Sequence, residues 1–221
     1  MPLTFPTFQQ FTLKVAWEVT DSNPATTKFD WVKECTVVNA RTGQSTSKST
    51  STLSDELDFG QNFQSGDGLT TTCELKQSSR TFRTTSVISS ASSSSTMGSA
   101  DKTETLSFTP FLVNVLATSL TVPHANPDSA THTWTKSCTA TTTRSAVALD
   151  VITKEGAEAV TSLDFGRVFF KGDSVVILCN LRQTFGGTTI TFTSAAVTTT
   201  VDITDAQNKN LALNYGSFMV I

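Results

Sequence analysis

Charged residues, histidines and long apolar runs are all scarce in this sequence. Only 16 % of its 221 residues are charged, and the formal net charge is −3 with a pI near 5.3. Nucleic-acid-binding domains leave a basic footprint in their composition, so this charge balance predicts no nucleic-acid partner. No run of about 18 apolar residues occurs, and we therefore predict no membrane span.

The N-terminal stretch lacks the marks of a secretory signal peptide. Residues 2–11 read PLTFPTFQQF, with neither a basic n-region nor a continuous apolar h-region. Two explanations stay open. The chain is a mature or recombinant form, or it does not leave the cell by that route.

Residues typical of catalytic and metal sites are also few. The only histidines are His124 and His132, and without a third ligand or a C-x-x-C spacing a zinc site has little support. No G-x-S-x-G motif occurs. Asp67 and Asp173 follow glycines in matching places, which is typical of structural turn residues rather than calcium ligands. We therefore predict no catalytic residues, no metal, no cofactor and no enzymatic activity.

Hydroxyl groups, in contrast, are abundant. The chain contains 41 Thr and 26 Ser, and Thr favours strands while Ser favours turns and linkers. None of the nine Asn lies in an N-x-[ST] sequence, which excludes N-glycosylation. O-glycosylation is a hypothesis for the Ser-rich stretch and for Thr139, Thr141, Thr142 and Thr143, against the simpler interpretation of unmodified strand surface.

A long internal repeat organises the sequence. DWVKECTVVNAR at 30–41 returns as TWTKSCTATTTR at 133–144, at an offset of 103 residues. LDFG at 57–60 returns at 163–166, and the matches continue at an offset of 106 through Phe63, Gly66, Asp67, Cys73, Leu75 and Gln77. So many rigidly spaced matches indicate two tandem copies of one unit.

The repeat predicts two domains with a linker. Residues 89–102 are rich in serine and almost free of apolar residues, which is typical of a flexible linker. We therefore place the first domain at 1–88 and the second at 103–221. The second copy ends in an additional apolar tail at 205–221.

Each copy has the pattern of a β-sandwich. Apolar residues alternate in FTLKVAW at 11–17, and turn signals separate many short strand-like runs of this kind. No amphipathic helix is evident. We therefore predict an all-β chain of two tandem sandwich domains.

Four cysteines, two per copy, allow three disulfide connectivities. Only the pairs Cys35–Cys73 and Cys138–Cys179 keep the two copies equivalent and clasp each copy separately, whereas four free buried thiols are the alternative. Trp31 and Trp134 lie four residues before a Cys, so on a strand both side chains share one face and the Trp is expected beside the bridge. Disulfides predict an oxidising compartment or a cell surface.

The order of these residues resembles a known group of domains. Trp and Cys, then L-x-F, then F-x-x-G-D leading to Cys-x-Leu, is similar to the Ig-like modules of ectodomains, especially PKD- and REJ-type repeats. The resemblance covers both copies and implies an extracellular adhesion or structural module. In antibody-type domains the Trp follows the first Cys, whereas here it precedes it. Lys33 and Lys136 share the parity of Trp and Cys, and we expect both at a sheet margin.

Both chain ends are apolar, which is unusual for termini. The residues that we predict to contact a neighbouring copy are Leu3, Phe5, Phe8, Leu211, Leu213, Tyr215, Phe218 and Val220. The alternative is that each end completes a strand of its own domain. The leading hypothesis is a non-enzymatic subunit of an extracellular or surface filament, sheath or coat, with further copies of the chain as partners. A virion coat protein and an adhesion or glycan-binding module are the alternatives.

Overall fold

The computed structural model describes residues 9–52 and 56–216, apart from the side chains of 192–195. The chain forms two compact units, Met1–Ser78 with Thr85–Pro110, and Ser79–Thr84 with Phe111–Ile221. The described residues form strands and no helix, so none of them belongs to a helix that could cross a membrane.

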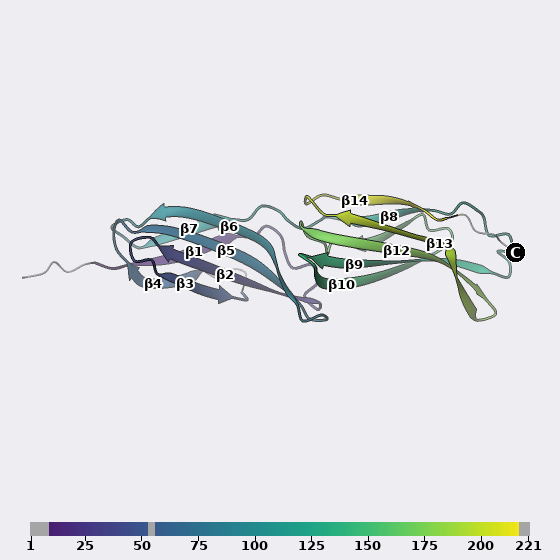
Figure 1. The fold of residues 1–221 in the computed structure, drawn as a ribbon, viewed down its shortest axis with the longest axis horizontal. Helices are drawn as coiled ribbons and strands as arrows, with labels where there is room; N and C mark the ends of the chain where they lie inside the picture. The colour runs from purple at the N-terminus through teal and green to yellow at the C-terminus, as the bar shows by residue number, and fades with distance from the viewer. Residues whose placement is uncertain (1–8, 53–55, 217–221) are drawn as a thin grey trace, which may run out of the picture. The chain divides into compact units, whose positions relative to one another are not determined.

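The first unit has two sheets, one of three strands and one of four (Figure 1). The three-stranded sheet has the order β4-β1-β7, and the four-stranded sheet has the order β3-β2-β5-β6. The strands are β1 (Phe11–Glu18), β2 (Phe29–Asn39), β3 (Ser45–Thr50), β4 (Leu57–Phe63), β5 (Gly68–Ser79), β6 (Thr85–Thr96) and β7 (Lys102–Ser107).

The second unit has the same two sheets in the same order. They are β11-β8-β14 and β10-β9-β12-β13, so each strand corresponds to the strand seven places earlier. The strands are β8 (Leu116–Thr121), β9 (Thr133–Arg144), β10 (Val147–Ala157), β11 (Ser162–Gly166), β12 (Asp173–Phe185), β13 (Thr188–Asp202) and β14 (Lys209–Asn214). The predicted all-β duplication is confirmed. The strand order differs from that of an antibody constant domain, whose sheets are ABED and CFG.

The first and last strands of each unit are parallel neighbours. β7 pairs with β1 in parallel, and β14 pairs with β8 in the same way. In each unit the chain therefore comes in at one end, here called the proximal end, and leaves at the opposite, distal end.

The predicted flexible linker at 89–102 is wrong. Residues 89–96 belong to β6, where Ser89 to Thr96 pair in order with Leu75 to Gly68 of β5. Lys102 starts β7, which pairs with β1. Serine is a poor indicator of a strand, but pairing with a neighbouring strand outweighs its weak intrinsic preference.

Both predicted disulfides are present and clasp their own units. The bridges are Cys35–Cys73 and Cys138–Cys179, and they close loops of 38 and 41 residues. Trp31 and Trp134 are buried, and Trp134 belongs to the same core cluster as Cys138 and Cys179. The alternation of buried residues along β2 and β12 puts these side chains on the inner faces.

The expectation that Lys33 and Lys136 lie at a sheet margin is wrong. Lys33 is fully buried, with Nζ 4.2 Å from the centre of the Trp17 ring. Lys136 is 4 % exposed, and Nζ donates to the carbonyl of Val160 at 2.6 Å. Burial lowers the pKa of Lys136. Specific partners inside the sandwich replace the water that the ammonium groups lose.

The predicted intermolecular role of the C-terminal tail is wrong for its described part. β14 pairs with β8 of its own unit, and Leu213 and Tyr215 are buried in that unit's core with Leu211 packed against it. These side chains fill the second sandwich, as the alternative interpretation expected. Phe218, Val220 and the predicted N-terminal contacts Leu3, Phe5 and Phe8 lie outside the described residues.

Candidate interaction surfaces

A buried carboxylate fastens a turn at the proximal end of the first unit. Asp67 follows Gly66, whose φ of 90° favours glycine, and it accepts a hydrogen bond from the backbone N–H of Gln64 at 2.9 Å. Asn39 Nδ2 donates to the same carboxylate at 2.7 Å, and Arg41 forms an ion pair with it. The hydrogen bond from Arg41, together with those from the Gln64 N–H and Asn39, lowers the pKa of Asp67 from 3.8 to about 2.

The second unit repeats this arrangement more deeply. Asp173 follows Gly172 and accepts from the backbone N–H of Phe170 at 2.8 Å, while Arg144 Nε donates to it at 2.7 Å. The side chain of Arg144 is only 5 % exposed, against 47 % for Arg41. Burial raises the pKa of Asp173, and the Arg144 charge opposes that shift.

These two clasps account for the paired aspartates that the repeat places in turns. Both carboxylates bind arginine and backbone N–H groups, as structural turn residues do. Across 9–52 and 56–216, no three His, Cys, Asp or Glu side chains gather in a group that could hold a metal ion.

The outer face of the four-stranded sheet in the second unit is lined by hydroxyl and aliphatic groups. Thr141 lies between Val151 of β10 and Val176 of β12, and Thr139 lies between Thr153 and Leu178 in the next row. The exposed fractions of Val151, Val176 and Leu178 are about 40 %. Of the predicted O-glycosylation sites, Thr139, Thr141 and Thr143 are partly exposed on this face. Thr142 is buried, so its prediction is wrong.

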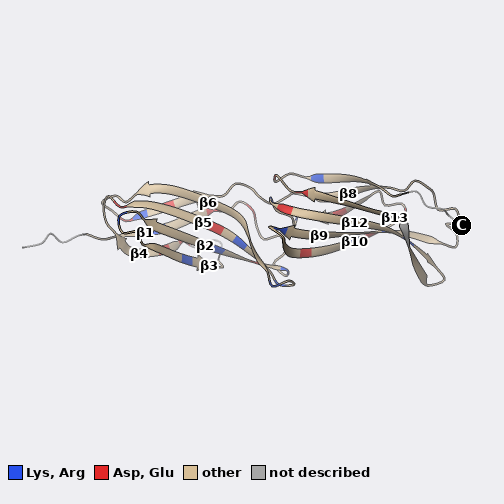
Figure 2. Ribbon diagram, viewed as in Figure 1, with Lys and Arg blue, Asp and Glu red and all other residues tan. Residues whose placement is uncertain are grey.

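Each four-stranded sheet ends in a long uncharged strand. β6 contains no charged residue, Pro or Gly, and β13 contains none before Asp202 (Figure 2). Sheet edges are usually protected by charges, prolines or bulges, because an open edge can pair with another chain. Each strand has one irregularity in register, near Val87 in β6 and between Phe192 and Val197 in β13. Residues 89–96 and 197–202 pair in regular register, and Asp202 is the one residue among them that is charged, a proline or a glycine.

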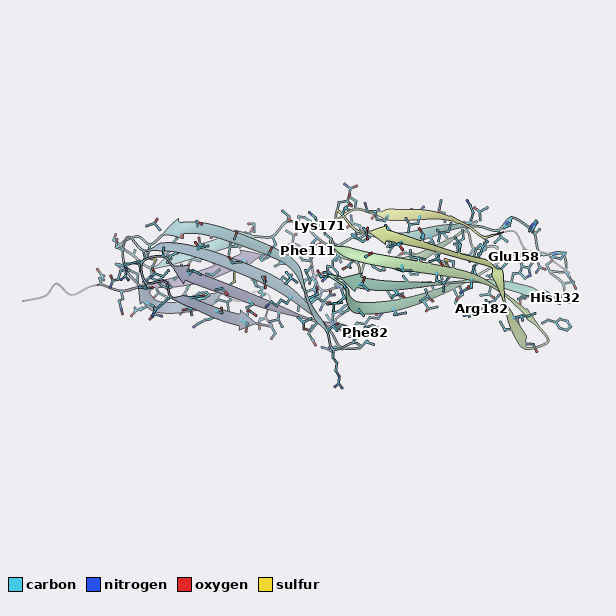
Figure 3. The ribbon with its side chains drawn as sticks, viewed as in Figure 1. Phe82, Phe111, His132, Glu158, Lys171 and Arg182 are labelled. Carbon is cyan, nitrogen blue, oxygen red and sulfur yellow. A yellow bond between two sulfur atoms is a disulfide. The ribbon has the colours of Figure 1, made fainter. Side chains whose placement is uncertain are left out.

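The β12–β13 hairpin projects at the distal end of the second unit (Figure 1). Gly186 and Gly187, with φ of 52° and 84°, close it in a two-residue turn that requires positive φ at both positions. Phe185 and Ile190 are the most exposed large hydrophobic residues among the described ones, at 57 % and 59 %. The His132 ring stacks on Phe185 with centroids 4.8 Å apart, and Figure 3 labels His132 at this end.

The proximal end of the first unit carries a polar groove. Its lining residues are Val37, Asn39, Gln44, Ser45, Thr46, Asn62 and Phe63. The groove lies where β2 and β4 end and β3 begins, next to the turn that Asp67 and Asn39 fasten.

The sequence prediction did not include the hairpin patch of Phe185, Ile190 and His132. The Gly pair at 186–187 is typical of a hairpin turn, and Phe185 keeps the parity of the buried residues of β12. The sequence pattern alone cannot show that the opposite sheet stops short of these residues and leaves them exposed.

Comparison with known proteins gives distant likeness in fold alone. No protein-family model matches the sequence, and neither does any curated protein. The minor pilin GBS52 of Streptococcus agalactiae superposes with a TM-score of 0.38 at 10 % identity, covering 96 % of this chain and 98 % of that one. A proposed cell adhesion protein of Bacteroides eggerthii gives 0.43 at 9 % identity, covering 95 % and 88 %. The major pilin T-13 of Streptococcus pyogenes gives 0.33 at 8 % identity, covering 96 % and 98 %.

Proposed function

We propose that the chain is a non-enzymatic structural subunit of an extracellular or surface assembly and associates with further copies of itself. The observation that carries this proposal is the pair of long uncharged edge strands, β6 and β13. An edge of this kind offers a row of backbone donors and acceptors to another strand. Strand addition along these edges would join copies side by side.

Two further features support a structural role outside the cell. Each unit has its own disulfide, which suits an oxidising environment and stabilises the unit independently of its neighbour. The buried carboxylates of Asp67 and Asp173 bind arginine and hold turns together, which suits a structural protein.

Charged substitutions on the edge test the proposal. Sedimentation velocity of the wild-type chain from micromolar to millimolar concentration should reveal self-association, which Thr198→Lys with Thr200→Lys on β13 should weaken. The control is Thr141→Lys, which adds a charge to the same face on the central strand β9. A wild-type chain that stays monomeric over the whole range would rule out the proposal.

An adhesion or glycan-binding module is the second candidate, because the hairpin patch contains an exposed aromatic ring. Phe185 and His132 are stacked, and Gln183 lies beside them in a small pocket with Thr188 and Ile190. Glycan-array binding that is lost in Phe185→Ser would favour this candidate. A virion coat has no specific observation in its favour.

A further inference from the structure

We propose that β13 pairs with β13 of a second copy, antiparallel and about a two-fold axis at Thr199, so that two four-stranded sheets become one. This inference rests on the proposed function and names which of its two edges makes this contact, with which partner and in which register. The paired segment is 197–201, here called the β13 edge. It belongs to the part of β13 that pairs in regular register with β12, and Asp202 follows it.

The backbone groups that the β13 edge leaves open alternate along the strand. The N–H of Ile203, just after β13, donates to the carbonyl of Asp173 at 2.8 Å, so these two residues form a hydrogen-bonded pair. Residues 197–202 keep the same register against β12 without a shift. In an antiparallel ladder such pairs alternate with pairs that make no hydrogen bond. The N–H and C=O groups of the odd-numbered residues therefore point towards β12, and those of Thr198 and Thr200 point away from it.

These open groups restrict the register of a second copy. Thr198 and Thr200 can bond only to residues whose own backbone groups point outward, so even-numbered residues must pair with even-numbered ones. Two such antiparallel registers keep five residues of the regular part in contact, 197–201 or 198–202. The first is centred on Thr199 and pairs Thr198 with Thr200 of the second copy. The second is centred on Thr200 and pairs Thr198 with Asp202.

The inner face of the β13 edge favours the register centred on Thr199. Val197 and Val201 face the core, because they pair with the fully buried Cys179 and Val175 of β12. Both valines pack against the core cluster but are only partly buried, because no strand lies beyond them in the sheet. The two-fold axis places Val197 against Val201 of the second copy twice. Each copy thus covers the half-exposed valines of the other.

The position of the charge favours the same register. Asp202 is exposed, and its carboxylate accepts a hydrogen bond from Ser174 Oγ at 2.7 Å. The register centred on Thr200 would bring Asp202 of both copies into the paired segment, and a parallel pairing in register would set the two carboxylates side by side. Like charges directly opposite each other destabilise a sheet. Centred on Thr199, the paired segment contains no charge, and its outer face consists of threonine pairs.

The other uncharged edge, β6, has no comparable side chains. Ala91, Ser93 and Ser95 pair with buried residues of β5, so they lie on the inner face of the first sandwich. Ser93 Oγ donates to Glu104 at 2.6 Å, so its hydroxyl already has a partner within its own unit. A strand added along β6 would cover small and polar groups and bury little apolar area. We therefore assign the two-fold contact to β13.

A contact between two identical edges is isologous and closes on itself. The β13 edge would therefore give dimers whose joined sheets contain twice four strands. Growth beyond the dimer would use a different surface, and β6 is the second edge that the proposed function offers.

Cysteine cross-linking of the full chain tests the axis and the register. At the axis, Thr199 lies opposite Thr199 of the second copy in a pair without hydrogen bonds, where Cα atoms are about 4.5 Å apart and a disulfide can form. Thr199→Cys should therefore give covalent dimers under mild oxidation. Thr198→Cys and Thr200→Cys should cross-link only when the two variants are mixed. The control is Thr139→Cys on the central strand β9, which should stay monomeric. Peptide mapping checks that both native disulfides are intact.

Sedimentation velocity measures the strength of the contact. Thr198→Lys with Thr200→Lys sets lysines opposite each other twice across the axis, so dimerisation should weaken at least about tenfold. The matched control is Ser92→Lys with Ser94→Lys, which adds the same charge at exposed positions of β6 and should leave the dimer intact. Circular dichroism checks that each variant is folded.

Three results would overturn the inference. Thr199→Cys that does not cross-link, or Thr200→Cys that cross-links alone, would exclude the axis at Thr199. Dimers that survive the β13 substitutions and are lost with the β6 substitutions would exclude the β13 contact, while the proposed function would stand through β6. A wild-type chain that stays monomeric would refute both.

Discussion

Arg144 should be far more important for stability than Arg41, its counterpart in the first repeat. Both arginines bind a buried turn aspartate, but the side chain of Arg144 is 5 % exposed and that of Arg41 is 47 % exposed. We consider the matched substitutions Arg144→Met and Arg41→Met, which keep an unbranched side chain and remove the charge. The comparison isolates the effect of burial on one repeated interaction.

The expected loss in the free energy of unfolding depends on the hydrogen-bond partners that each aspartate keeps after the substitution. After Arg144→Met, Asp173 keeps the N–H of Phe170 but loses its charge partner inside the core, and breaking a buried pair in this way costs about 3–5 kcal/mol. After Arg41→Met, Asp67 keeps both Asn39 and the N–H of Gln64. A half-exposed ion pair contributes about 0–1 kcal/mol, so a cost near 1 kcal/mol is expected. A domain of this size has a total stability of about 5–15 kcal/mol.

Urea unfolding followed by circular dichroism at pH 7 measures both costs in the full chain. The deficit of Arg144→Met should shrink as the pH falls below neutrality. Burial raises the pKa of Asp173 above its ordinary value, so in the variant the folded state takes up a proton before the unfolded state does. Equal costs for the two substitutions, or a cost for Arg144→Met below about 1 kcal/mol, would refute the reasoning.

Three further predictions follow from the same structure. Asp67→Asn should remove roughly 2 kcal/mol of stability at neutral pH. In the wild type this contribution is present above pH 3.8 and is lost as the pH falls towards 2, so measuring the free energy of unfolding over this pH range would test it. Replacement of Cys138 and Cys179 by alanine should destabilise the second unit by about 4 kcal/mol, as calorimetry would show, because the bridge closes a loop of 41 residues. Deletion of residues 1–8 should leave both disulfides intact and weaken self-association, because Leu3, Phe5 and Phe8 are predicted to contact a neighbouring copy; sedimentation unchanged by the deletion would exclude that role.

The repeat made much of the fold predictable. Equivalent Trp, Cys and Gly-Asp positions gave both disulfides and the duplication of the sandwich, because these residues have fixed places on strands and turns. Asp67 and Asp173 could be recognised as turn residues because each follows a glycine in both copies. The sequence shows that Arg41 and Arg144 occupy matching positions, but it does not show that they bind these aspartates.

The errors arose where tertiary contacts outweigh local composition. The serines of β6 looked like a linker, yet β5 supplies a partner for every residue from Ser89 to Thr96. Lys33 and Lys136 were expected at a sheet margin, where their ammonium groups would reach solvent. The sequence cannot show that the Trp17 ring lies beside the ammonium group of Lys33, or that the carbonyl of Val160 accepts a hydrogen bond from Lys136. The residues of β14 were predicted to contact a neighbouring copy. Their apolar pattern does not show that this strand pairs in parallel with β8 of its own unit.

Electron microscopy of the native material tests the central claim most directly. We expect polymers built from many copies of the chain. Native material that contains only isolated single chains would contradict this expectation.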